Sequence, residues 1–112
     1  MIVSFTRLGK APDLVEVKLD VDRLEKKLSG DSGRTVNIDP GYIDYFKAVL
    51  ASFKEGPQKI YLGSGVYADP VLMFEDHKWR ILPWSFPDFK EGLYMEEFST
   101  IRNIYKEQRR EL

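Results

Sequence analysis

Residues 59–84 read KIYLGSGVYADPVLMFEDHKWRILPW. Three apolar runs rich in β-branched and aromatic side chains are separated here by two short turns, the pattern of strands joined by tight hairpins. Because proline has no N–H to donate to a ladder, Pro70 predicts a β-bulge or a sheet edge within the middle run. The expected strands are residues 59–62, 66–74 and 79–84, and the expected turns are residues 63–65 and 75–78. The stretch therefore predicts a three-stranded antiparallel meander.

Two amphipathic helices are expected on either side of this meander, because apolar residues recur at intervals of three and four. Pro12 and Asp13 suit the first turn of the earlier helix, and Gly30 suits its end. Its apolar stripe consists of Leu14, Val17, Val21, Leu24 and Leu28. The later helix is expected over residues 91–110, with Tyr94, Phe98, Ile101 and Tyr105 on its buried face.

The remaining segments are less regular. Residues 2–8 and 34–39 have strand character, and residues 39–41 suit a turn. Residues 43–54 fit both periods: a helix would align Ile43, Phe46, Leu50 and Phe53, and a strand would alternate Phe46, Ala48 and Leu50. We favour the helix here. Together the elements predict an α+β fold: a single, mostly antiparallel sheet with a C-terminal three-stranded meander and two or three helices packed on one face.

The composition predicts one domain over residues 1–112, with an apolar fraction of 43% that supplies a core. The absence of Cys excludes a disulfide scaffold and a thiol nucleophile, and a single His excludes a multi-His zinc site. A net charge of −1 gives no general attraction to nucleic acid or to anionic membranes. With no apolar run long enough to span a bilayer and no signal peptide, we expect a cytoplasmic protein. Abundant charges with few Asn and Gln are typical of thermophilic proteins.

Several polar and aromatic residues are candidates for a binding site. Asn37 and Asp39 precede a Pro-Gly turn, where they would either bind a cation or hydroxyl group or form an Asx turn. Asp69 lies within a strand and needs a solvated face or a partner such as Lys54 or Lys59. The aromatic segment around Trp84 and Asp88 would either stack a base or sugar or pack under the last helix. The full candidate set is Asn37, Asp39, Tyr42, Lys54, Lys59, Tyr61, Asp69, Trp84 and Asp88.

Two familiar kinds of site have no support in the sequence. Gly63-Ser64-Gly65 follows a strand but precedes another strand, so it predicts a hairpin turn rather than a phosphate loop with a helix N-terminus. His77 lies in the other turn, where a solvated side chain is expected, and one such His cannot supply a Ser-His-Asp triad. No metal ligand set is assigned on this basis.

Three runs together resemble the prokaryotic family catalogued as domain of unknown function 4416. They are residues 34–42 (RTVNIDPGY), 59–69 (KIYLGSGVYAD) and 84–89 (WSFPDF). Residues 49–54 and 101–106 also match the family's pattern, so the resemblance spans about residues 4–108. It implies no established activity. Members are sometimes labelled GTP-binding regulators, but no residue pattern in this chain supports that label.

The chain departs from the family's usual pattern in several places. Asp69 stands where the family usually has Glu, Pro70 where it has no proline, and Lys59 where it has Arg. Phe86 and Phe89 stand where it usually has Tyr, so a phenol-based role for that loop does not carry over. Members also usually carry an additional N-terminal segment. A surface that such a segment would cover favours self-association, which makes a second copy of the chain a candidate partner.

Three functional hypotheses follow. The first, which we favour, is a small non-enzymatic binding or regulatory module of unknown ligand, for which a nucleotide such as GTP is one candidate. The second is a metal-dependent hydrolase or phosphoryl-transfer enzyme, in which Asp39, Asp69 and Asp88 would hold Mg²⁺ or Mn²⁺. The third is a structural or self-assembling protein.

Overall fold

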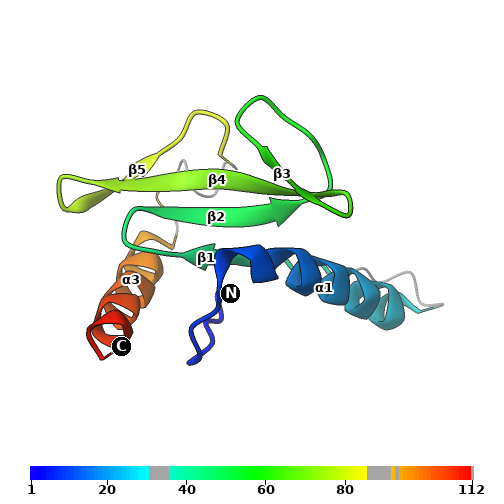
Figure 1. Ribbon diagram of the computed structural model, residues 1–112, viewed down its shortest axis with the longest axis horizontal. Helices are drawn as coiled ribbons and strands as arrows, with labels where there is room; N and C mark the ends of the chain where they lie inside the picture. Colours follow the sequence, from blue (N-terminus) through cyan, green and yellow to red (C-terminus); the bar gives the residue numbers. More distant parts are fainter. Residues whose placement is uncertain (31–35, 86–91, 93, 112) are drawn as a thin grey trace. The chain divides into compact units, whose positions relative to one another are not determined.

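The structure is a computed structural model, and it describes residues 1–30, 36–85, 92 and 94–111 (Figure 1). The elements make an α+β fold with one mostly antiparallel five-stranded sheet and, in these ranges, two α-helices. In chain order they are η1 (Ala11–Asp13, a 3-10 turn), α1 (Leu14–Ser29), β1 (Gly41–Ile43), β2 (Lys47–Ser52), β3 (Ile60–Gly63), β4 (Val66–Glu75), β5 (Lys78–Ile81) and α3 (Met95–Arg110). The expected fold class is confirmed, whereas the packing of the helices on one face stays a prediction.

The sheet is organised around β4, its longest strand (Figure 1). The strand order is β1-β2-β4-β3, and β5 also pairs with β4. β3 runs antiparallel to the first part of β4, with Tyr61 opposite Tyr67. β5 runs antiparallel to the last part, with Phe74 opposite Trp79. The two predicted antiparallel hairpins are therefore confirmed, with β3 and β5 pairing with successive parts of β4.

Pro70 lies between these two ladders, where neither β3 nor β5 has a residue in register with it. Residues 82–85 supply donors in this interval instead. The indole Nε1 of Trp84 donates to the carbonyl of Pro70 at 2.7 Å, and the buried hydroxyl of Ser85 donates to the carbonyl of Val71. The register shift expected near the proline occurs in β3 rather than in β4. The proline thus lies where the ladders with β3 and β5 are both interrupted.

The helix favoured for residues 43–54 is wrong, because β1 ends and β2 forms within this segment. A tight turn separates the two strands. The Oδ1 atom of Asp44 accepts hydrogen bonds from the backbone N–H groups of Phe46 (2.8 Å) and Lys47 (3.0 Å). This side-chain turn competes with helical hydrogen bonding. Moreover, two residues of the proposed helical face are left exposed, Phe46 at 63% and Phe53 at 42%.

Two further predicted strands are also wrong. Residues 2–8 contain no strand, and Val3 and Phe5 are 67% and 84% exposed. Strand propensity has no effect where no neighbouring strand offers hydrogen bonds. Of the strand expected over residues 34–39, residues 34 and 35 lie outside the described part, and residues 36–39 are irregular. The strand begins only at Gly41, so the expected turn at residues 39–41 ends in β1.

Other boundaries agree more closely with the sequence. α1 follows Pro12 and ends at Gly30, whose φ of +35° is one that glycine tolerates. β5 ends at Ile81, earlier than predicted, because Pro83 cannot continue a ladder. α3 begins at Met95; part of the turn predicted before it lies outside the described residues.

The described residues form two compact units. We call them the α3 unit, comprising Met1–Gly9, Tyr42–Val49 and Pro70–Leu112, and the α1 unit, comprising Lys10–Gly41 and Leu50–Asp69. The buried apolar side chains of the α3 unit are Ala48, Val49, Val71, Leu72 and Phe98. Those of the α1 unit are Leu14, Ala51, Val66 and Ala68. The single domain expected from the length stays a prediction.

No helix within the described ranges is both long and apolar enough to cross a membrane.

The hairpin between β4 and β5 gives a direct test of the register. Asp76 and His77 both adopt a positive φ, +50° and +64°, as a two-residue type I′ turn requires. We expect His77→Gly to raise the free energy of unfolding by about 0.5 kcal/mol, since glycine adopts this conformation without steric strain. We expect His77→Val to lower it by about 1 kcal/mol, because a β-branched residue is strained at positive φ. Urea unfolding of both variants measures this, and equal stabilities would contradict the turn.

Candidate functional site

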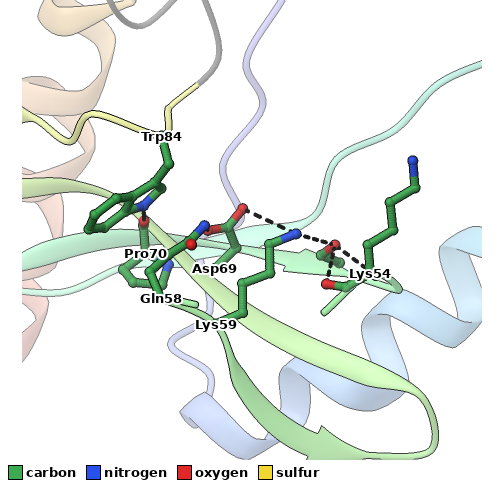
Figure 2. Close-up of polar contacts among 7 residues, drawn as sticks. Lys54, Gln58, Lys59, Asp69, Pro70 and Trp84 are labelled. Atoms are coloured by element: carbon green, nitrogen blue, oxygen red, sulfur yellow. Dashed lines mark hydrogen bonds and ion pairs between the residues drawn. The ribbon is translucent and has the colours of Figure 1, made fainter. Parts of the chain in front are cut away.

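Four polar side chains gather in the α1 unit, where β2 ends, β3 begins and β4 passes (Figure 2). We call Ser52, Gln58, Lys59 and Asp69 the polar cluster. Gln58 Nε2 donates to Asp69 Oδ1 at 3.0 Å, and Lys59 Nζ donates to Ser52 Oγ at 3.1 Å. Lys59 Nζ also lies 4.0 Å from Asp69 Oδ2. The sequence indicates Lys54 or Lys59 as the partner of Asp69, and in the structure Lys59 is the lysine that lies beside it.

The two charges of the polar cluster are largely removed from water. The side chains of Lys59 and Asp69 are only 14% and 12% exposed. Taking either charge out of water is costly, and the attraction between them offsets part of that cost only while both are present. At 4.0 Å the pair is an ion pair without a direct hydrogen bond, so Ser52 and Gln58 supply the hydrogen bonds that the charges need.

A glycine allows the lysine to reach this position. The backbone N–H of Lys59 donates to the carbonyl of Gly56 at 3.1 Å, which closes the turn before β3. A Cβ atom on Gly56 would lie 3.3 Å from both Cδ and Cε of Lys59. A side chain here would require the lysine stem to move by a few tenths of an ångström, so a glycine leaves room for that stem where it lies.

Immediately after Lys59 the chain enters β3, which ends the strand path of the sheet. Ile60, Tyr61 and Leu62 are 63%, 59% and 36% exposed. The rings of Tyr61 and Tyr67 lie 5.0 Å apart, and the Tyr61 hydroxyl accepts a hydrogen bond from the N–H of Gly65. Leu62 lies at the register shift of β3, between the paired residues Tyr61 and Gly63. The polar cluster thus fixes the start of an exposed apolar edge strand.

The side chains of the other sequence-predicted residues do not join the polar cluster through any contact that the structure gives. Asn37 and Asp39 are exposed on the irregular segment before β1. Lys54 is exposed, and its ammonium points away from Lys59 and Asp69 (Figure 2). Only its backbone approaches, since its N–H donates to Ser52 Oγ at 3.0 Å.

Of the remaining candidates, Trp84 belongs to the α3 unit, and Asp88 is not among the described residues. Trp84 is 47% exposed, and its indole N–H is bound to the Pro70 carbonyl. Asp88 lies outside the described residues, as do Phe86 and Phe89. Within the described ranges, no three His, Asp or Glu side chains are grouped so as to hold a metal ion. Sequence reasoning missed Ser52 and Gln58, for which no motif exists.

Tyr42, another predicted residue, lies in a second polar group in the α3 unit. Burial raises the pKa of its phenol above the ordinary value, while nearby Lys47 lowers it and Asp44 raises it. The ammonium of Lys47 lies 2.7 Å from Asp44 Oδ2, and this hydrogen bond raises the pKa of Lys47. The arrangement stabilises the β1–β2 turn and keeps both Tyr42 and Lys47 protonated at neutral pH.

The polar cluster predicts a strong dependence of stability on both charges. We expect Lys59→Met to lower the free energy of unfolding by about 2–3 kcal/mol, because Asp69 would be left buried without its counter-charge. The double variant Lys59→Met with Asp69→Asn should recover more than half of this loss. Lys54→Met is the matched control, with a change within about 0.5 kcal/mol because Lys54 is exposed. Urea unfolding of all variants provides the measurement; equal effects at Lys54 and Lys59 would contradict a buried pair.

The second polar group predicts the response to high pH. A raised pKa in the folded state means that folding favours the protonated form, so the stabilisation is complete below the unfolded-state pKa. It is lost as the pH rises through the folded-state pKa, which places the loss above about pH 10 for Tyr42 and Lys47. Tyr42→Phe should therefore lose less stability than the natural chain between pH 9 and pH 11, as followed by thermal unfolding. Tyr61→Phe, a change at an exposed tyrosine, is the control; identical profiles for Tyr42→Phe and the natural chain would refute the assignment.

Comparison with the curated proteins finds no match, and comparison with the solved structures finds none either. The family model described as "Domain of unknown function (DUF4416)" matches residues 1–105. This match covers the polar cluster, the β3–β4 hairpin and the first two thirds of α3. The chain therefore belongs to the family of domain of unknown function 4416.

Proposed function

We propose that the chain is a protein-binding module that takes an extended peptide segment along the outer edge of β3. The observation that carries this proposal is the run of three exposed apolar side chains, Ile60, Tyr61 and Leu62, on the strand that ends the sheet path. An edge strand presents N–H and C=O groups that pair readily with another strand. Main-chain hydrogen bonds would give affinity, and the exposed side chains of Ile60 and Leu62 would contact apolar side chains of the partner.

Edge strands that must avoid partners usually carry a charge, a proline, a bulge or a covering segment, or are very short. β3 reads Ile-Tyr-Leu-Gly and contains neither charge nor proline, although its register shifts between Tyr61 and Gly63. Its shortness limits the number of main-chain hydrogen bonds, so the apolar side chains would supply much of the affinity. The polar cluster supports this role because it fixes the residue before Ile60, which reduces the ordering required on binding.

The other functional hypotheses have weaker support. Gly63 and Gly65 lie in the β3–β4 hairpin, so no helix N-terminus follows them to bind a phosphate of GTP. For a metal-dependent hydrolase, Asp69 is engaged by Gln58 and Lys59, and the exposed Asp39 belongs to no group of three metal-ligating side chains in the described residues. A binding role requires no such constellation.

A library of displayed random peptides, 12 residues long, provides the probe. We expect it to yield extended sequences with alternating apolar residues that bind the chain, with the affinity measured by fluorescence anisotropy. Leu62→Lys should weaken the selected peptides at least about tenfold, the loss of one well-packed contact. Ile104→Lys, at an exposed position of α3, is the control and should leave binding unchanged. Selected peptides that bind Leu62→Lys normally would overturn the proposal, and so would failure to select any.

The unfolding midpoint tests the alternatives in parallel, alone and with Mg²⁺, Mn²⁺, GTP, GDP and a short single-stranded RNA. A ligand present at a hundred times its dissociation constant adds about 2.7 kcal/mol of stability. A shift with GTP alone would favour a nucleotide-binding module. A shift with Mn²⁺ that disappears in Asp39→Ala would favour the metal-dependent enzyme.

A further inference from the structure

The apolar stripe of α1 is only partly buried by the rest of its unit. Leu14 is 4% exposed, but Val17, Leu24 and Leu28 are 41%, 44% and 52% exposed, and Val21 is half-buried. The intervals along the stripe are three, four, three and four residues. This alternation is the seven-residue repeat of a coiled-coil seam, in which such side chains interlock with those of a second helix.

We propose that α1 pairs with α1 of a second copy of the chain, antiparallel, through a seam made of Val17, Val21, Leu24 and Leu28. In this register Val17 faces the partner's Leu28, and Val21 faces the partner's Leu24. The two-fold axis repeats both contacts, so the seam has four layers. It uses the three exposed members of the stripe and does not need Leu14, which is already buried in its own chain.

The charges that flank the seam favour this partner and this direction. Lys18 and Glu25 flank one side, and Asp20 and Lys27 flank the other. Antiparallel pairing brings like sides together, so Lys18 meets the partner's Glu25 and Asp20 meets the partner's Lys27. Each pair occurs twice, which gives four attractive pairs and no like-charge pair. A second copy therefore complements α1 without any other protein.

The competing arrangements lack this match. A parallel pair would place Asp20 beside the partner's Glu25 on both sides of the dimer. An antiparallel pair shifted to include Leu14 would place Lys18 beside the partner's Lys18 and Asp20 beside the partner's Asp20. Like charges at flanking positions select against an alignment, so the charges specify the register that the exposure of the seam also indicates.

The intrachain contacts of α1 identify which flank to alter. Lys18 Nζ lies 4.9 Å from the ring centroid of Phe53 in its own chain. Asp20 uses one carboxylate oxygen for Arg23, at 2.5 Å, and its second oxygen can accept Lys27 of the partner subunit. Lys27 is exposed and has no ion pair among the described contacts. A change at Lys27 thus disturbs the dimer more than the fold.

Sedimentation equilibrium of the full chain provides the test. Four layers make an interface at the small end of those found in specific complexes, so we expect a dimer of moderate affinity. The weight-average mass should rise from 13.1 kDa towards twice that value between about 10 μM and 1 mM, a range that brackets weak association. Leu24→Gln should weaken association at least about tenfold. Lys26→Gln, an exposed change off the seam, should leave it unchanged, and circular dichroism should show that both variants are folded.

The flank charges test the direction. Lys27→Glu should weaken the dimer about as much as Leu24→Gln, and adding Asp20→Lys to Lys27→Glu should restore it by exchanging the two charges. A monomer at 1 mM would overturn the proposal and leave the seam to a helix of another protein. A dimer that persists in Leu24→Gln would overturn it too, and if Leu62→Lys abolished that dimer the interface would be β3. A dimer insensitive to Lys27→Glu would overturn the antiparallel register.

Discussion

The desolvated pair of Lys59 and Asp69 is the constraint on which the α1 unit depends. Each charge is costly to bury, and each is tolerable only because the other lies 4.0 Å away and a neutral side chain hydrogen-bonds to it. Satisfying both charges requires the end of β2, the turn at Gly56 and the middle of β4 to meet in one arrangement. An apolar cluster would accept several such arrangements, whereas a buried pair with fixed partners accepts few. The pair therefore specifies where β3 begins.

A related constraint acts on the residue after Asp69. Pro70 removes one donor from β4 at the place where the ladders of β3 and β5 stop. Residues beyond β5 supply donors there: Trp84 donates to the carbonyl of Pro70, and Leu82 and Ser85 donate to that of Val71. Trp84 is the first residue of the aromatic segment that was considered as a stacking surface, and it has a structural role. Its indole N–H stabilises the sheet by donating to the Pro70 carbonyl, and its ring is partly exposed.

The sequence predicts those parts of the fold whose cause is local. Gly63 and Gly65 indicate a turn because only glycine adopts their φ values, +106° and +78°, without strain. The helix α1 is also predicted from a local pattern, the recurrence of apolar residues at intervals of three and four. β2 was not predicted because Ala48, Val49 and Ala51 are all buried, so the apolar residues of this strand do not alternate with polar ones. The sequence predicts only part of the polar cluster. A carboxylate within a strand, Asp69, indicates that a partner is needed. The contacts of Ser52 and Gln58 join residues seven and eleven positions apart, and no sequence pattern predicts such pairs.

The distribution of satisfied and unsatisfied groups indicates what kind of recognition this chain is built for. Two of the polar side chains expected to carry chemistry are occupied within the chain: Asp69 by Gln58 and Lys59, and Trp84 by Pro70. A ligand that recruited these groups would have to replace contacts that the fold needs. By contrast, the apolar side chains of β3 and of the α1 seam are exposed, and covering them would cost no internal hydrogen bond. Selection for binding through apolar surfaces is therefore compatible with the stability of the fold, whereas selection for polar chemistry at Asp69 would oppose it.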